Sequence, residues 1–163
     1  MGAGKTTIGR QLAKELKLDF VDSDHEIEER TGANIAWIFD VEGEEGFRAR
    51  ESKMIEELTE RKKIVLATGG GAVLSPENRK FLQSRGTVVY LMATINQQVE
   101  RTQHDQRRPL LQNVDDTRAK LTELMETRDP LYREVADHVI MTSRRNPKAV
   151  SNEIVKMLTG ETV

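Results

Sequence analysis

The stretch Gly2-Ala3-Gly4-Lys5-Thr6-Thr7 decides the fold of this chain. It supplies the last part of the phosphate-loop pattern G-x-x-x-x-G-K-[ST], in which glycines let backbone N–H groups close around phosphate oxygens. Apolar residues follow at nearly helical spacing from Ile8 to Leu18. The stretch is therefore expected to open a helix whose positive end points at bound phosphates. This pattern predicts an ATP site formed by Gly2, Ala3, Gly4, Lys5, Thr6 and Thr7.

Two side chains of this stretch have the chemistry that phosphoryl transfer needs. Lys5 can reach the β- and γ-phosphates, and the Thr6 hydroxyl can ligate Mg²⁺. We expect Lys5 to be catalytic and Thr6 to be a metal ligand. The alternative is a flexible, glycine-bearing segment capped by threonine, which the helical spacing directly after it disfavours.

The pattern is incomplete, because its first glycine and the strand that normally precedes it would lie upstream of Met1. We expect Met1 to be an internal methionine of a longer phosphate loop. Without that strand, N–H and C=O groups of its neighbours would be left unpaired, each costing roughly 1–3 kcal/mol if buried. The chain as written is then expected to be poorly folded or weakly active. Otherwise it would fill the gap by rearrangement or with a strand from another molecule.

The composition describes a single globular domain. The chain has 163 residues, 37% hydrophobic and 32% charged, enough for one core. A formal net charge of -2 gives no general attraction to nucleic acid or anionic membranes, and no apolar run approaches the roughly 20 residues of a membrane span. The absence of cysteine excludes disulfides and thiolate metal sites. We expect one cytoplasmic domain over residues 1–163, with no nucleic-acid or membrane partner.

Short apolar segments alternate with helical patterns along the chain, and strands are expected at 19–22, 64–67, 88–91 and 138–141. This alternation predicts an α/β fold of three layers, a parallel sheet with helices on both faces. Helical segments with breaks near Gly32 and at 42–46 indicate a subdomain at about 23–60. The polar, arginine-rich segment at about 103–116 is expected to be a mobile lid.

Five further segments carry a resemblance to a known family. In order they are Asp22-Ser23-Asp24, Gly43-Glu44-Glu45-Gly46-Phe47-Arg48, Gly69-Gly70-Gly71, Arg107-Arg108-Pro109-Leu110-Leu111 and Arg128-Asp129-Pro130-Leu131-Tyr132. With them the chain resembles shikimate kinase along nearly its whole length. The resemblance implies a P-loop kinase fold with a five-stranded parallel sheet, a substrate-binding subdomain and a lid. It also implies transfer of the γ-phosphoryl group of ATP, with Mg²⁺, to the 3-hydroxyl of shikimate in aromatic amino-acid biosynthesis.

Asp22 and Asp24 follow the first expected strand, at the end of the sheet where ligands of open parallel sheets bind. On an extended segment, i, i+2 spacing points both side chains to one side. The resemblance implies that Asp22 orients the hydration shell of Mg²⁺ and that Asp24 contacts the acceptor as the catalytic base. The alternative is a helix N-cap formed by Ser23 or Asp24.

Two arginines and a run of glycines are the candidate acceptor site. Guanidinium groups match carboxylates with two parallel hydrogen bonds, so Arg48 and Arg128 are expected to bind the acceptor carboxylate, unless they are ordinary solvated arginines. Glu51, one helical turn after Arg48, can hold that guanidinium in place. Gly70 and Gly71 are expected to let the backbone approach the acceptor closely, with a plain strand-to-helix turn as the alternative.

Further arginines are assigned to the nucleotide. Arg108 lies in the expected lid, where its charge can neutralise the transferring phosphoryl group, so we expect it to be catalytic and to bind ATP. A solvated charge run is the alternative. Arg101, Arg145 and Pro147 are expected to flank the adenine.

Two other functions stay open at this point. One is another small-metabolite P-loop kinase, such as a gluconate or nucleotide kinase, although two arginines and three glycines favour a carboxylated ring. The other is a nucleotide-binding protein that is inactive through N-terminal truncation. The expected form is a monomer that binds ATP and shikimate.

Overall fold

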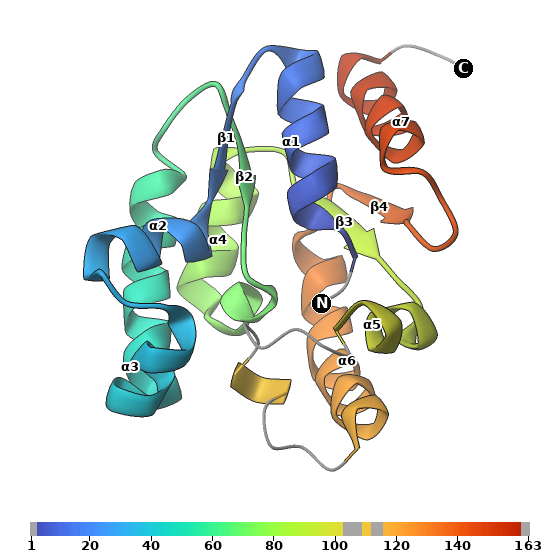
Figure 1. Ribbon diagram of the computed structural model, residues 1–163. Coiled ribbons are helices and arrows are strands. Elements are labelled where there is room, and N and C mark those ends of the chain that lie inside the picture. The colour runs from blue at the N-terminus through green and yellow to red at the C-terminus, as the bar shows by residue number, and fades with distance from the viewer. Residues whose placement is uncertain (1–2, 103–108, 112–115, 161–163) are drawn as a thin grey trace.

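The computed structural model describes residues 3–102, 109–111 and 116–160 (Figure 1). Its strands are β1 (Asp19–Asp22), β2 (Ile64–Ala67), β3 (Val89–Met92) and β4 (His138–Met141). Its α-helices are α1 (Lys5–Leu16), α2 (Ser23–Thr31), α3 (Ile35–Leu58), α4 (Pro76–Arg85), α5 (Ile95–Thr102), α6 (Thr117–Val135) and α7 (Pro147–Thr159). Two short 3₁₀ helices are η1 (Gly70–Leu74) and η2 (Pro109–Leu111). Each strand expected from the sequence is present, the third beginning one residue later than expected.

Local sequence signals set where the helices begin. α4 and α7 each start with a capping side chain followed by proline, at Ser75-Pro76 and Asn146-Pro147. α1 differs, because Gly4 precedes it with a left-handed φ of 81° and no side chain caps its first turn. The N–H groups of that turn therefore keep their hydrogen-bonding capacity for a ligand.

The strands form two parallel pairs. β1 pairs with β2, from Asp19 opposite Ile64 to Asp22 opposite Ala67, and β3 pairs with β4 in a similar way. Within the described residues β2 and β3 are not hydrogen-bonded to each other, so each has one paired and one unpaired edge. The expected parallel α/β architecture is confirmed. Where the resemblance implies five strands in one sheet, these residues contain four strands in two pairs.

A cavity of about 950 Å³ separates the two pairs of strands. Residues of β2 and β3 line it, together with apolar residues of α1 and α7, and Figure 1 shows α1 in front of the space between these strands. One end of the cavity reaches Ala3 and Gly4 of the phosphate loop, and the other reaches Lys62 and Lys63 before β2. The cavity thus runs along the full length of β2, beside its unpaired edge.

Helices cover both faces of the strands. α1 and α7 pack against each other on the near face in Figure 1, and α4 and α6 lie behind. One apolar cluster joins α1, β4 and α7 through Ile8, Leu12, Ile140, Val150 and Ile154. A second cluster lies between β1, α2 and α3 and contains Val21, Ile27, Ile38, Phe47, Met54 and Leu58. None of the described helices is both long enough and apolar enough to cross a membrane.

A kink divides α3 into two helical parts. Gly43 has a φ of 74° and a ψ of 176°, which interrupts the helical backbone at the position of the break expected near 42–46. This left-handed φ is strained for residues with a Cβ. The rings of Phe39 and Phe47 meet across the kink with centroids 4.9 Å apart. The second part of α3 then presents Arg48 and Glu51 to the ends of β1 and β2.

An added strand is expected to stabilise this fold. A fusion of about ten residues ahead of Met1, forming an apolar strand that ends in Gly-x, would place a chain between β2 and β3, where it can pair with both edges. We expect the fused chain to melt at a higher temperature, because the strand would satisfy backbone groups and cover apolar walls of the cavity. Thermal unfolding followed by circular dichroism measures the difference.

A glycine- and serine-rich extension of the same length is the control, since it lacks both strand propensity and apolar side chains. Equal melting temperatures for the two fusions would show that the cavity does not accept a strand.

Candidate active site

The start of α1 and the end of β2 lie next to each other. Lys5 Nζ donates a hydrogen bond of 2.5 Å to the carbonyl oxygen of Thr68, directly before the three glycines. Thr6 and Thr7 are exposed in the first turn of α1. This arrangement places the phosphate-loop lysine at the carboxyl end of the strands, where parallel α/β folds bind ligands.

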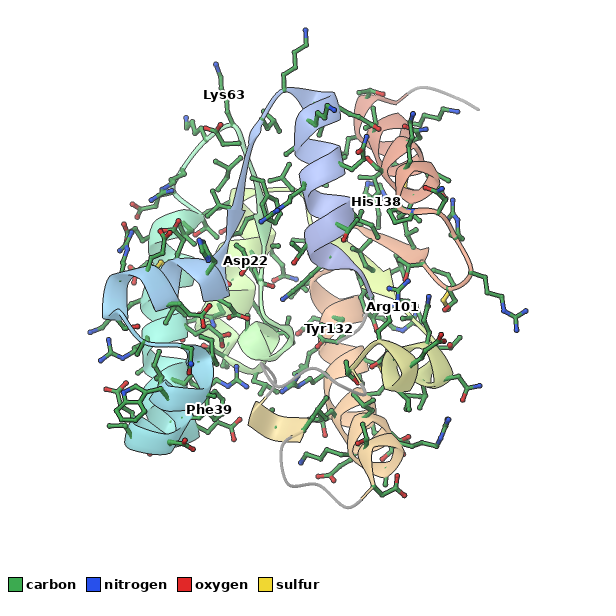
Figure 2. The ribbon with its side chains drawn as sticks, viewed as in Figure 1. Asp22, Phe39, Lys63, Arg101, Tyr132 and His138 are labelled. Atoms are coloured by element: carbon green, nitrogen blue, oxygen red, sulfur yellow. The ribbon has the colours of Figure 1, made fainter. Side chains whose placement is uncertain are left out.

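The residues assigned to the nucleotide are only partly brought together. A Cβ built on Gly4 would lie 3.2 Å from Nη1 of Arg101, so this arginine is beside the phosphate loop, as Figure 2 also shows. Arg145 instead forms an ion pair of 2.5 Å with Glu153 of α7, and Pro147 begins that helix. The place of Arg145 and Pro147 beside an adenine stays a prediction. Gly2, Arg107 and Arg108, with most of the expected lid, lie outside the described residues.

Asp22 ends β1 and caps α2. Its Oδ1 accepts hydrogen bonds from the N–H groups of Asp24, at 2.9 Å, and His25, at 3.2 Å. The N-cap considered for Ser23 or Asp24 is therefore formed by Asp22. The reasoning from an extended i, i+2 spacing was wrong, because Asp24 lies in the first turn of α2. It reaches the end of β2 because that turn changes the direction of the chain.

The three glycines lie against the charged side chains of the site. A Cβ on Gly69 would be 3.0 and 3.1 Å from the carboxylate oxygens of Asp24 and 3.2 Å from Oε2 of Glu51. On Gly71 it would overlap the guanidinium group of Arg48. On Gly70 it would be 3.2 Å from Nη1 of Arg128. The structure thus brings Asp24, Arg48, Arg128, Gly70 and Gly71 together around one turn.

One arginine is held by a neighbouring carboxyl group and the other is buried. Arg48 Nη1 donates to Glu51 Oε1 at 2.9 Å, as expected for a side chain one helical turn away. Glu51 has only 1% of its surface exposed and Arg128 only 3%, so neither charge is solvated. A guanidinium group that is restricted by its surroundings is preorganised for a carboxylate.

Two carboxyl groups in the site have perturbed acidity. Burial raises the pKa of the Asp24 carboxyl, and the positive charges of Lys5 and Arg48 offset part of that rise. Burial likewise raises the pKa of the Glu51 carboxyl, against the opposing effect of Arg48. Asp24 Oδ1 and Glu51 Oε2 are both buried without a hydrogen-bond partner among the described residues. A buried carboxyl group with a raised pKa beside fixed cationic side chains is a candidate proton acceptor.

Sequence reasoning gave no role to Tyr132. Its hydroxyl donates a hydrogen bond of 2.7 Å to the carbonyl oxygen of Gly70, and Figure 2 places it near the centre of the molecule. The sequence marks it as the last residue of the segment 128–132 and places it four residues after Arg128, which puts both side chains on one face of α6.

The raised pKa of Glu51 predicts a pH dependence of stability. Between the ordinary glutamate pKa of 4.5 and its higher folded value, the folded chain holds this proton longer than the unfolded chain does, so the group lowers stability as pH rises. Glu51→Gln removes this contribution. The unfolding free energy of the variant, relative to the unsubstituted chain, should therefore increase as pH rises above 4.5 and level off once the pH has passed the folded pKa, as measured by urea denaturation.

Glu42→Gln is the matched control, because the pKa of Glu42 is shifted in the opposite direction to that of Glu51. Arg50, at 2.6 Å, lowers the pKa of this exposed carboxyl, so its contribution is present above pH 4.5 and is lost as pH falls through the folded pKa. If the unfolding free energy relative to the unsubstituted chain rose with pH for both variants, the assignment of Glu51 as a carboxyl group whose burial lowers stability would be contradicted.

Comparisons with known proteins identify the family of this chain. The family model described as shikimate kinase matches residues 1–159. The shikimate kinase of Shewanella frigidimarina (strain NCIMB 400) is 61% identical over 158 residues, which cover 97% of this chain and 92% of that protein. The shikimate kinase of Histophilus somni (strain 2336) is 56% identical over 158 residues, covering 97% and 90%.

Solved structures give the same result. The shikimate kinase from Acinetobacter baumannii in complex with shikimate has a TM-score of 0.96 and 51% identity, covering 100% of this chain and 90% of that one. The enzyme from Aquifex aeolicus has a TM-score of 0.84 and 34% identity, covering 98% and 92%. By sequence and by structure, this chain belongs to the shikimate kinase family.

Proposed function

We propose that this chain transfers the γ-phosphoryl group of ATP to the 3-hydroxyl of shikimate, in the cytoplasm and as a monomer. The observation that carries the proposal is the grouping of Asp24, Arg48 and Arg128 around the glycine turn, within reach of Lys5. Two guanidinium groups suit a carboxylate, and a buried carboxylate beside them suits a hydroxyl. The A. baumannii relative, solved with shikimate bound, supports this assignment.

The phosphates of ATP would bind at the start of α1. Its uncapped first turn offers N–H donors, and the loop residues Ala3 and Gly4 precede that turn. Gly2, which the sequence pattern also assigns to the phosphates, lies outside the described residues. Lys5 would exchange its contact with the Thr68 carbonyl for one with the β- and γ-phosphates. Thr7, which is exposed in the same turn, would also bind ATP. Arg101, Arg145 and Pro147 would lie around the adenine.

Thr6 and Asp22 would hold Mg²⁺. The described residues contain no group of three or more His, Cys, Asp or Glu side chains that could form a metal cage. A hydroxyl, a carboxylate acting through water, and the phosphates of ATP fit an ion that usually keeps several water ligands. When bound, Mg²⁺ would neutralise phosphate charge. Asp22 already uses Oδ1 as the cap of α2, which fixes the direction of its carboxylate.

The acceptor would bind with its carboxylate between Arg48 and Arg128 and its ring beside Gly70 and Gly71. In the transfer, the 3-hydroxyl oxygen forms a bond to the γ-phosphorus while the bond to the bridging oxygen of ADP breaks. The hydroxyl proton passes to the Asp24 carboxylate, which its burial makes a stronger base than a solvated aspartate. Lys5 stabilises the charge on the leaving phosphate, and Arg108 would do so from the lid.

A panel of acceptors tests the function. ADP release, coupled to a spectrophotometric assay, is measured with shikimate, gluconate, a nucleoside monophosphate and no acceptor. We expect release only with shikimate. Release with gluconate or the nucleotide alone would assign a different kinase, and ATP binding without any release would assign a nucleotide-binding protein without phosphotransfer.

Gly71→Ala is expected to weaken acceptor binding. The new Cβ would overlap the Arg48 guanidinium, so that arginine must leave its position. Loss of a charge-assisted contact of about 1.5–3 kcal/mol should lower shikimate affinity at least tenfold, with ATP affinity nearly unchanged. Calorimetric titration of each ligand measures both.

Gly86→Ala is the control, because Gly86 has an extended φ of 179° and a Cβ there meets nothing within 4 Å. If Gly71→Ala bound shikimate as tightly as this control, Arg48 would not be an acceptor contact.

A further inference from the structure

The hydroxyl of Tyr132 joins the two halves of the acceptor site. It donates a hydrogen bond of 2.7 Å to the carbonyl oxygen of Gly70. A Cβ built on Gly70 would lie 2.9 Å from this hydroxyl and 3.2 Å from Nη1 of Arg128, so the hydroxyl and the guanidinium group converge on the same residue. Tyr132 thus connects α6 to the glycine turn after β2, beside Arg128.

The hydroxyl keeps its proton at neutral pH. Burial raises the pKa of the Tyr132 hydroxyl, and the neighbouring Arg128 and Arg48 only partly offset that rise. Tyr132 is therefore a neutral donor to the Gly70 carbonyl under the conditions in which the enzyme would act. That donation gives the Gly70 C=O a partner and so fixes the direction of the peptide plane.

The ring of Tyr132 is fixed by a second tyrosine. Its centroid lies 4.8 Å from that of Tyr90 in β3, at an interplanar angle of 45°. The Tyr90 hydroxyl points elsewhere and donates at 2.8 Å to Oδ1 of Asp129, whose Oδ2 accepts from Arg133. The two tyrosines thus share a packing environment, but only the hydroxyl of Tyr132 touches the acceptor site.

We propose that Tyr132 is a positioning residue for the acceptor carboxylate, because its hydroxyl holds the Gly70 carbonyl at the place where the Arg128 guanidinium also meets the glycine turn. It acts through these two groups and need not touch the acceptor. Without the hydroxyl, Arg128 loses a fixed polar neighbour on its own helix and the Gly70 carbonyl loses its donor. This inference rests on the proposed function, since it assumes that Arg128 binds the carboxylate of shikimate.

The test compares Tyr132→Phe with Tyr90→Phe. Each removes one hydroxyl from the same pair of packed rings and keeps the ring itself, so their effects on folding should be similar. For Tyr132→Phe we expect the Kd and KM for shikimate to rise about five- to thirtyfold, with the KM for ATP within about twofold of the unsubstituted chain. Tyr90→Phe should leave the affinity for shikimate within about twofold.

The methyl ester of shikimate separates positioning from general damage. The ester lacks the charge that Arg128 would bind, so the unsubstituted chain should prefer shikimate strongly over it. Tyr132→Phe should reduce this preference by about the same factor as it reduces shikimate affinity. The affinity for the ester should change little, because the ester has no carboxylate for Arg128 to bind.

Two results would overturn the inference alone, provided that the unsubstituted chain binds and phosphorylates shikimate. One is equal shikimate affinity for the two variants. The other is an equal loss for shikimate and its ester in Tyr132→Phe. If the unsubstituted chain neither bound nor phosphorylated shikimate, the proposed function and this inference would both be wrong.

Discussion

The candidate site depends on one steric constraint, the contact between the backbone of residues 69–71 and the charged side chains around it. Each of the three glycines faces a different part of the site: Asp24 with Glu51, Arg128, and Arg48. The four elements that supply these groups, α2, α3, α6 and the end of β2, can meet only because nothing larger than hydrogen projects from the turn. The charges are then close enough to compensate one another, which a buried charge requires.

Much of this arrangement could be predicted from the sequence, because its signals are local. The phosphate-loop pattern located the start of α1 to within two residues, and short apolar runs located all four described strands. The pair Arg48 and Glu51 followed from their spacing on a helix and is present at 2.9 Å. The three glycines indicated a close approach of the backbone, although the sequence did not show which side chains approach it.

The features that the sequence did not predict depend on contacts between distant segments. Tyr132 and Gly70 are 62 residues apart, and their hydrogen bond uses a backbone carbonyl that no sequence pattern marks. Asp24 was placed on an extended segment, yet the Asp22 side chain caps α2, so Asp24 lies in the first turn of that helix. The strands form two pairs because β2 and β3 are separated by a cavity. The pattern of apolar residues within a strand does not show which other strand pairs with it. Arg108 and most of the lid lie outside the residues that the structure describes.

The unpaired edges of β2 and β3 have a consequence for amide hydrogen exchange. In a parallel ladder, successive N–H groups of a strand point alternately to its two sides. Along β2, every second amide therefore points toward β1 and the others point toward the cavity, and β3 is arranged in the same way relative to β4. Protection from exchange should alternate with a period of two along both strands, at neighbouring positions that are equally deep in the fold. The central strands of this protein would then combine some of its slowest and some of its fastest exchanging amides.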